Sequence, residues 1–221
     1  MVRVIILDFD GTLGDTRANI VLTMRQTLQQ RGYPVADEDT IAATIGLPLE
    51  EGFRQLLPGI SGTETTACAA TYREIFETNR KLLIPKLFPG VKETLAQLKE
   101  EGYVLTIASS RSSRSLKGFL CDMEIAGYIT YILGADNVRL TKPDPEPVLR
   151  TLSDLGFKPE EAMVVGDMPV DILMGRRAGA LTCGVTYGNS TRSDLLAAGA
   201  GFVIDDFASI LQLMPSFRTE I

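Results

Sequence analysis

The sequence predicts an α/β fold, in which a Rossmann-like parallel sheet carries an inserted α-helical cap. Three features of the chain support this prediction. An aliphatic run, VIIL, lies near the N-terminus, patterns typical of helices and strands alternate after about residue 90, and the stretch between them contains helical patterns only. Strands that alternate with helices form parallel sheets with helices on both faces.

The first strand is predicted at Val4 to Leu7, because an unbroken aliphatic run is typical of a strand covered on both faces. Two carboxylates, Asp8 and Asp10, follow it directly. Gly11 and Thr12 then offer a turn with little side-chain bulk, where backbone N–H groups can approach an anion. Ligands of α/β sheets bind at the carboxyl ends of strands, so this stretch predicts a site for a cation and a phosphate.

The next part of the chain is predicted to be helical. Its first helix is capped by Asp15 or Thr16 and ends at Gly32. Further helices are expected at Asp37 to Ala43, Leu49 to Leu57 and Thr63 to Leu83. No other strand is expected before about residue 103. We therefore expect residues 15–86 to form a helical cap, and residues 1–14 and 87–221 to form the catalytic core.

The rest of the chain alternates between helices and strands. Helices are predicted at Val91 to Glu101, Ser113 to Cys121, Pro145 to Leu155, Pro169 to Ala178, Ser193 to Ala197 and Phe207 to Leu213. Strands are predicted at Tyr103 to Ala108, Tyr131 to Leu133, Ala162 to Val165, Leu181 to Val185 and Phe202 to Ile204. Parallel strands joined by helices bring their carboxyl ends to one edge of the sheet.

Composition narrows the range of functions. A net charge of −6 disfavours nucleic acid and anionic membranes as partners, since both attract clustered basic residues. The absence of histidine excludes a Ser-His-Asp triad, a Cys-His pair and histidine-ligated zinc. Cys68, Cys121 and Cys183 are widely spaced and are predicted to be buried, reduced thiols. Neither a signal peptide nor a membrane span is predicted at the N-terminus, so we expect a cytoplasmic protein. No sequence feature indicates an oligomeric state.

Five more polar residues follow predicted strands or lie in the loops beyond them: Ser109, Ser110, Lys142, Asp167 and Asp171. Each has an ordinary structural explanation when it is taken alone. The serines can cap a helix, Lys142 can be a solvated loop residue, and Asp171 suits the first turn of a helix. Their order along the chain, together with Asp8 and Asp10, favours one shared crevice instead.

These motifs carry a family resemblance. The segment DFDGTL, Ser109 after a hydrophobic strand, the pair Lys142-Pro143 and the segment GDMPVD resemble the four motifs of the haloacid dehalogenase superfamily of aspartate-nucleophile phosphotransferases. Within that superfamily the chain is most similar to phosphoglycolate phosphatase-like hydrolases, on the segments DGTL followed by Asp, IGLP and PGV. Two positions depart from the common pattern: Ser110 stands where Asn is frequent, and Met168 where a small polar residue is common.

The resemblance implies a mechanism. Asp8 would attack phosphorus to form an aspartyl phosphate, and Asp10 would act as acid and then base. Mg²⁺ would lie between the Asp8 carboxylate, the Asp10 main-chain carbonyl and Asp167, with support from Asp171. The phosphoryl group would be bound by Ser109, Ser110 and Lys142, with Gly11 and Thr12 in the adjoining turn. The expected substrate is a small phosphorylated metabolite, with phosphoglycolate as the leading candidate.

Other functions remain open at the level of sequence. A sugar phosphomutase of the β-phosphoglucomutase type uses the same pair of acids and a similar cap, and pyrophosphate or a nucleotide could also be the substrate. The dehalogenase and phosphonatase branches are disfavoured, because both lack the acid that Asp10 provides. The segment DMPVDILMG also resembles phosphoacceptor receiver domains, which bind partners without turnover, but such domains are about half this length.

The predicted cap offers basic residues that could contact a substrate carboxylate: Arg54, Arg73, Arg80, Lys81 and Lys86. Each is expected to be structural, since solvated helix faces carry such residues routinely. Tyr72 and Phe76, which lie one helical turn apart, are expected to pack in the core of the cap. Gly14 and the stretch from Leu83 to Pro89 are the expected linkers about which the cap opens and closes.

Overall fold

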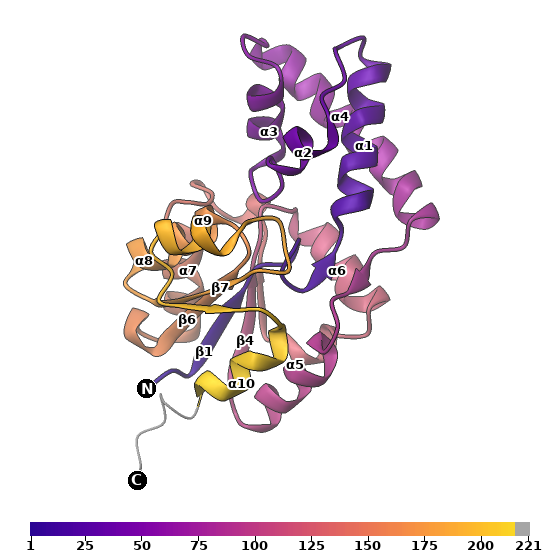
Figure 1. The fold of residues 1–221 in the computed structure, drawn as a ribbon. Helices are drawn as coiled ribbons and strands as arrows, with labels where there is room; N and C mark the ends of the chain where they lie inside the picture. Colours follow the sequence, from indigo (N-terminus) through magenta and orange to yellow (C-terminus); the bar gives the residue numbers. More distant parts are fainter. Residues whose placement is uncertain (215–221) are drawn as a thin grey trace.

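A six-stranded parallel sheet forms the centre of the computed structural model, which describes residues 1–214 (Figure 1). The strands lie in the order β5-β4-β1-β6-β7-β8. Their bounds are β1 (Val4–Leu7), β4 (Val104–Ala108), β5 (Tyr131–Leu133), β6 (Ala162–Gly166), β7 (Leu181–Val185) and β8 (Phe202–Ile204). The first strand of the chain is therefore central, and strands from distant parts of the sequence flank it.

Strand β1 is central because all four of its side chains are apolar and can be buried. Ile6 is paired with Thr106 of β4 on one side and with Val164 of β6 on the other. Alternate residues point to opposite faces of a strand. Ile5 and Leu7 accordingly join one buried apolar cluster, while Val4 and Ile6 join the other. Both faces of the sheet are thus covered, and a charge on β1 is tolerated only beyond its end.

Helices cover the two faces of the sheet. One face packs against α5 (Val91–Glu100), α6 (Ser113–Asp122) and α10 (Ile210–Leu213), and the other against α7 (Glu146–Leu155) and α8 (Pro169–Ala178). A short helix, α9 (Arg192–Ala197), lies between β7 and β8, and single 3₁₀ turns occur at Ala126–Tyr128, Ala135–Asn137, Pro159–Glu161 and Phe207–Ser209. Every predicted helix and strand of the sheet region is confirmed, with most ends shifted by at most two residues. The last predicted helix begins as a 3₁₀ turn, so α10 starts three residues later than expected, at Ile210.

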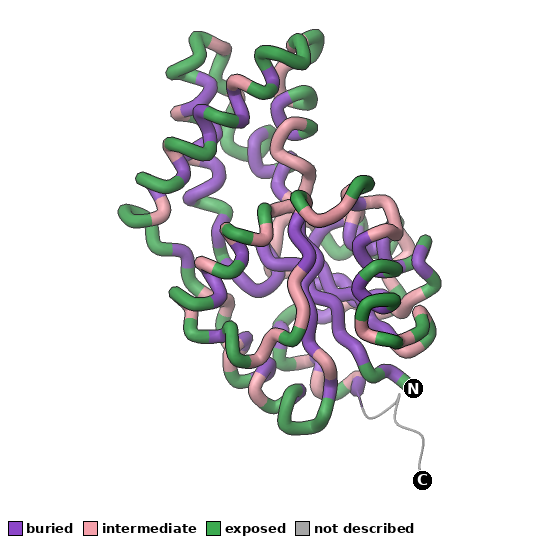
Figure 2. The backbone as a smooth tube through the Cα atoms, turned by 180° about the vertical axis from the view of Figure 1, so that it is seen from behind, coloured by how far each residue is buried: buried purple, intermediate pink, exposed green. Residues whose placement is uncertain are grey.

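A helical unit stands over the carboxyl edge of the sheet (Figure 1). It consists of α1 (Arg17–Gln30), α2 (Glu38–Ala42), α3 (Leu49–Leu56) and α4 (Gly62–Leu82), all of which the sequence predicted. Its apolar residues belong to the same buried cluster as Ile5 and Leu7 of the sheet. Tyr72 and Phe76 are buried and stacked, with ring centroids 5.8 Å apart, so their predicted packing role is confirmed. Figure 2 shows the buried inner faces of these helices and their exposed outer faces.

Three details differ from the sequence-based expectations. A two-stranded antiparallel ribbon joins β2 (Gly14–Asp15) to β3 (Lys86–Leu87), where no strand was expected. Two-residue strands carry no periodic pattern, and this pair forms because the two connections to the helical unit meet. Thr16 is the N-cap of α1, but its side chain makes no capping bond. Cys121 is exposed, unlike Cys68 and Cys183, because it lies on the outer face of α6.

Among the described residues, no helix is long and apolar enough to cross a membrane.

Candidate active site

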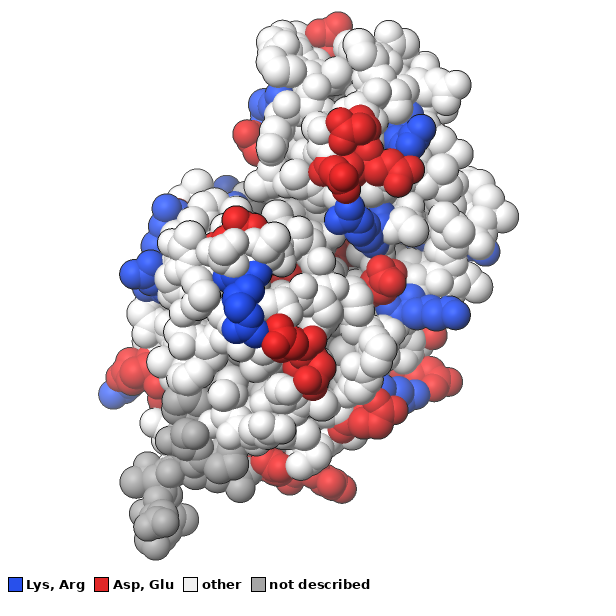
Figure 3. All heavy atoms as spheres, in the orientation of Figure 1, with Lys and Arg blue, Asp and Glu red and all other residues white. Residues whose placement is uncertain are grey.

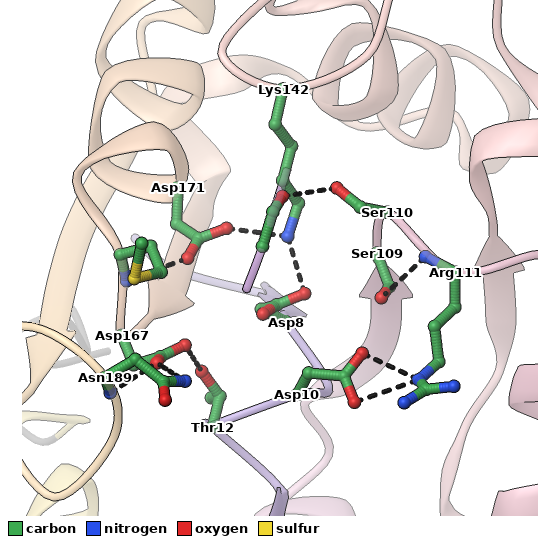
Figure 4. A network of polar contacts seen from close by, with 12 residues as sticks. Asp8, Asp10, Thr12, Ser109, Ser110, Arg111, Lys142, Asp167, Asp171 and Asn189 are labelled. Atoms are coloured by element: carbon green, nitrogen blue, oxygen red, sulfur yellow. Dashed lines mark hydrogen bonds and ion pairs between the residues drawn. The ribbon is translucent and has the colours of Figure 1, made fainter. Parts of the chain in front are cut away.

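Three strand ends place their polar residues close together at the carboxyl edge of the sheet (Figure 4). Asp8 follows β1, Ser109 follows β4 and Asp167 follows β6. Asp171 enters from the first turn of α8, and Lys142 from the loop before α7. The carboxylates of Asp8, Asp167 and Asp171 lie within 4.8 Å of one another, and all three residues are buried. The structure therefore brings together residues that the sequence separates by more than a hundred positions.

Lys142 is the cation at the centre of this acid cluster. Its Nζ lies 2.6 Å from Asp8 Oδ1 and 2.6 Å from Asp171 Oδ1, and it donates a hydrogen bond to Asp8. Burial alone would lower the pKa of Lys142, but the carboxylates of Asp171 and Asp8 outweigh burial and raise it. The lysine therefore stays charged, and its position is fixed by two acids.

Two acids of the cluster, Asp8 and Asp167, have raised pKa values. Burial raises the pKa of Asp8 well above its ordinary value against the opposing charge of Lys142, and the neighbouring carboxylates add to the effect of burial. Burial followed by Asp171 raises the pKa of Asp167 to about 7, against hydrogen bonds from Asn189 and Thr12. The single positive charge of Lys142 does not balance three buried carboxylates. The cluster consequently has too little positive charge for its acids.

The cluster fits a hard divalent cation. Asp8 Oδ2 is buried without a hydrogen-bond partner among the residues that the structure describes. An orphaned buried carboxylate oxygen is costly, and a cation bound beside it would satisfy it. Three carboxylates offer the oxygen ligands that Mg²⁺ prefers.

Asp10 lies apart from the acid cluster, and its carboxylate points the other way (Figure 4). Arg111 Nε donates to both of its oxygens, at 2.9 and 2.7 Å, and the Thr16 hydroxyl donates at 2.5 Å. The Arg111 guanidinium packs against two rings, with Cζ 4.7 Å from the centroid of Phe76 and 4.9 Å from that of Phe119. Since Phe76 belongs to α4 and Phe119 to α6, this arginine links the helical unit to the sheet.

The turn after β1 supports Asp167. The Thr12 hydroxyl donates to Asp167 Oδ1 at 3.1 Å. Gly11 has a φ of +83°, and a Cβ at this position would lie 2.2 Å from Asp167 Oδ2, so only glycine fits. On the other side, the backbone N–H and the side-chain amide of Asn189 each donate to Asp167 Oδ2 at 2.8 Å. Asp167 is thereby held in one orientation before any ligand arrives.

The two serines after β4 face different partners. The Ser109 hydroxyl accepts a hydrogen bond from the backbone N–H of Arg111 at 3.3 Å. The Ser110 hydroxyl donates to the Gly46 carbonyl at 2.6 Å, in the loop between α2 and α3. Gly46 has a φ of +91°, and a Cβ there would lie 3.1 Å from Met168 Cγ. The loop of the helical unit therefore lies directly on the sheet edge, close to Asp167.

Sequence reasoning missed Arg111, Asn189 and Thr16. Each lies in a loop just beyond a strand end: Arg111 after β4, Asn189 after β7 and Thr16 after β2. The rule that ligand-facing residues follow parallel strands applies to Arg111 and Asn189, and it would have indicated both. Thr16 has no such signal, because a threonine before a helix is typical of a cap.

The fold and the site together define a class of protein: an α/β enzyme with a buried acidic site at the carboxyl edge of its sheet. Comparison with known proteins identifies the family. The model of the haloacid dehalogenase-like hydrolase family matches residues 5–185. The chain therefore belongs to this family, which confirms the resemblance seen in its motifs.

Individual relatives agree with this assignment. The chain is 38% identical over 216 residues to a protein of Dickeya dadantii named "Probable phosphatase IndB", an alignment that covers 96% of this chain and 93% of that one. It is 30% identical to the phosphoglycolate phosphatase of Haemophilus influenzae, with 96% and 98% covered. A solved hydrolase from Pseudomonas syringae superposes with a TM-score of 0.86 at 25% identity, covering 97% of this chain and 99% of that one. These findings confirm the prediction of an enzyme of the phosphoric monoester hydrolase class.

Proposed function

We propose that this chain is a Mg²⁺-dependent phosphatase that hydrolyses a small phosphate monoester through an aspartyl phosphate on Asp8. One observation carries this proposal. Asp8 Oδ1 is bound by Lys142, while Oδ2 is buried with no hydrogen-bond partner among the described residues. A carboxylate that is fixed through one oxygen and left unpaired at the other is poised to react with phosphorus or to bind a cation.

The cation would be held by the carboxylates of Asp8 and Asp167, with Asp171 beside them and the Asp10 main-chain carbonyl as a further ligand. Bound there, Mg²⁺ would offset the charge of the phosphoryl group and of its attacking carboxylate. The ammonium group of Lys142, which is paired with Asp8, would help to offset the same negative charges. Ser109, the Ser110 backbone N–H and the turn of Gly11 and Thr12 would bind phosphoryl oxygens.

Asp10 would donate and accept the protons of the two transfer steps. In the first transfer its carboxyl group gives a proton to the leaving oxygen, and in the second it takes a proton from the water that attacks the aspartyl phosphate. Arg111 and Thr16 orient this carboxylate through three hydrogen bonds. The two acids of the DFD motif thus have separate tasks and separate surroundings.

The helical unit would serve as a cap that excludes water and selects the substrate. We assign residues 15–86 to this cap and residues 1–14 and 87–221 to the core. The ribbon of β2 and β3 supports this division, because both connections to the helical unit pass through it. Phosphoglycolate is the first substrate to test, since the relatives of similar length include phosphoglycolate phosphatases.

The proposal is tested by measuring p-nitrophenyl phosphate hydrolysis by wild type, Asp8→Asn and Asp154→Asn, with Mg²⁺ and with a chelator. Wild type and Asp154→Asn, whose exposed carboxylate lies on α7, should turn over only with Mg²⁺. Asp8→Asn should release no nitrophenol while keeping its circular dichroism. Turnover by Asp8→Asn, or full activity in the chelator, would contradict the mechanism.

A further inference from the structure

A cavity of about 740 Å³ lies between the helical unit and the edge of the sheet. Asp10, Ser110 and Arg111 line it from below, and residues of α1, α3 and α4 line it from above. The acid cluster of Asp8, Asp167 and Asp171 does not line it. If Asp10 protonates the leaving oxygen, as the proposed function requires, the leaving group of the substrate occupies this cavity.

The cavity is large for a short hydroxy acid such as glycolate. Pockets of about 300–1,000 Å³ enclose ligands of drug size, and this cavity lies in the upper half of that range. A short leaving group would contact few of its walls and would leave most of the volume to water. The size alone therefore favours a bulkier leaving group.

The upper wall of the cavity combines apolar side chains with the charged groups of Glu50, Arg73, Glu77 and Arg80. Ile20 and Met24 of α1, Leu49 of α3, and Tyr72 and Phe76 of α4 all line it. Burial of apolar surface against the apolar side chains is favourable, and only a leaving group with an apolar body gains it. The rings of Tyr72 and Phe76 are stacked on one another in this wall.

Three of the four arginines that line the cavity are ion-paired. Arg111 binds Asp10, Arg73 Nη2 lies 2.8 Å from Glu50, and Arg80 Nη2 lies 2.6 Å from Asp122. The cavity wall carries four guanidinium groups, including that of Arg114 at its exposed rim, and four carboxylates, those of Asp10, Glu50, Glu77 and Asp136. Figure 3 shows basic and acidic side chains side by side on a face where the helical unit meets the sheet. A substrate carboxylate would find no surplus positive charge here.

We infer that the preferred substrate is a phosphate monoester with a bulky, uncharged, ring-bearing leaving group, rather than a short anionic one. The inference rests on the proposed function and names the substrate class of the same site. Aryl esters and nucleoside 5′-monophosphates share this chemistry. The phosphate is held over Asp8, the ester oxygen faces Asp10, and the ring lies under Leu49 and Phe76.

The test compares kcat/KM for phosphoglycolate, 1-naphthyl phosphate and uridine 5′-monophosphate, all with Mg²⁺. At least one ring-bearing ester should exceed phosphoglycolate by about tenfold or more, as apolar pockets discriminate by such factors. Comparison of 1-naphthyl phosphate with uridine 5′-monophosphate shows whether the enzyme prefers an aryl or a nucleoside leaving group. If phosphoglycolate equals or exceeds both, the inference is overturned, while the proposed phosphatase function stands. If no ester is turned over, the proposed function fails, and the inference fails with it.

A variant that fills the cavity tests where the ring of the leaving group binds. Leu49→Trp inserts an indole into the upper wall, so the ratio of kcat/KM for the better ring-bearing ester to that for phosphoglycolate should fall about tenfold or more. Leu149→Trp makes the same change on exposed α7, away from the cavity, and should leave this ratio unaltered. Melting curves confirm that both variants fold. A ratio that is unchanged in a folded Leu49→Trp would overturn this placement.

Discussion

Arg111 Nε donates hydrogen bonds to both carboxylate oxygens of Asp10, at 2.9 and 2.7 Å. The side chains of both residues are about nine-tenths buried. Burial alone would lower the pKa of Arg111, but the carboxylate of Asp10 outweighs burial and raises it. Arg111 therefore stays positively charged. Because the same guanidinium also packs on Phe76 of α4, the orientation of Asp10 depends on the seating of the helical unit.

Replacing Arg111 should therefore impair catalysis more than binding. In Arg111→Gln, Thr16 is the one partner that the Asp10 carboxylate keeps among residues 1–214, and kcat should fall about 100-fold, as expected for a misplaced catalytic group. Arg111→Lys should restore little, because lysine offers neither the planar donor nor the stacking face. Steady-state kinetics would measure this. Arg192→Gln, which removes an exposed ion pair with Asp205, is the matched control. An unaltered kcat in Arg111→Gln would contradict this role.

Replacing Asp8 or Lys142 by an uncharged residue should have opposite effects on the stability of the metal-free protein. Asp8→Asn removes one of three mutually repelling carboxylates, so the metal-free variant should be at least as stable as wild type. Lys142→Met leaves these carboxylates without their cation and should cost about 3–5 kcal/mol. Urea unfolding without metal would measure both. If Asp8→Asn were destabilised as strongly as Lys142→Met, the repulsion inferred from the raised pKa of Asp8 would be wrong.

The metal-free protein should lose stability as the pH rises from about 4 to about 7. The pKa values of Asp8 and Asp167 are raised in the folded state, so over this interval the folded chain binds more protons than the unfolded chain. Each group then lowers the free energy of unfolding by up to about 1.4 kcal/mol per pH unit. Urea unfolding at a series of pH values would measure the slope. Asp167→Asn should flatten it, and a rise in wild-type stability over this interval would contradict the assignment.

Mg²⁺ should bind more tightly as the pH rises through about 7. The cation competes with the proton on Asp167, whose pKa lies at about 7 without metal. Binding should accordingly release protons below pH 7, which calorimetry in buffers of different ionisation enthalpy would detect. Asp154→Asn, on the surface of α7, should leave this release unchanged. Binding that is independent of pH would argue against Asp167 as a ligand.

Ser110→Ala should loosen the contact between the helical unit and the sheet. It removes the hydrogen bond of 2.6 Å to the Gly46 carbonyl, which contributes about 1 kcal/mol, or roughly a fivefold change in an equilibrium. The Ser110 backbone N–H remains, so KM should rise about fivefold while kcat changes less. Amide exchange in the loop at residues 43–48 should accelerate. Ser153→Ala on α7 is the control, and unchanged exchange in Ser110→Ala would contradict the contact.

The sequence predicted most of the fold because its elements are locally encoded. VIIL and AMVVG are apolar throughout, and breakers separate most of the helices. The crevice was also predictable, since Asp8 and Asp167 follow strands that lie side by side. Arg111 follows β4 and the same rule would have indicated it, but it was missed because a serine-rich loop with arginines resembles an ordinary helix start and its partner Asp10 lies 101 residues away. The ribbon of β2 and β3 forms where two segments distant in the sequence come together, and no local pattern encodes that contact.

That ribbon is the point at which the helical insertion is attached to the sheet region. Gly14 and Asp15 run beside Leu87 and Lys86, so the chain departs from the sheet and returns to it at a single point. Helices of another length or shape could be grafted between these two ends without disturbing any other connection of the sheet. A replacement insertion would keep the connections of the sheet, but it would have to supply new partners for Asp10 and Arg111, which Thr16 and Phe76 contact here.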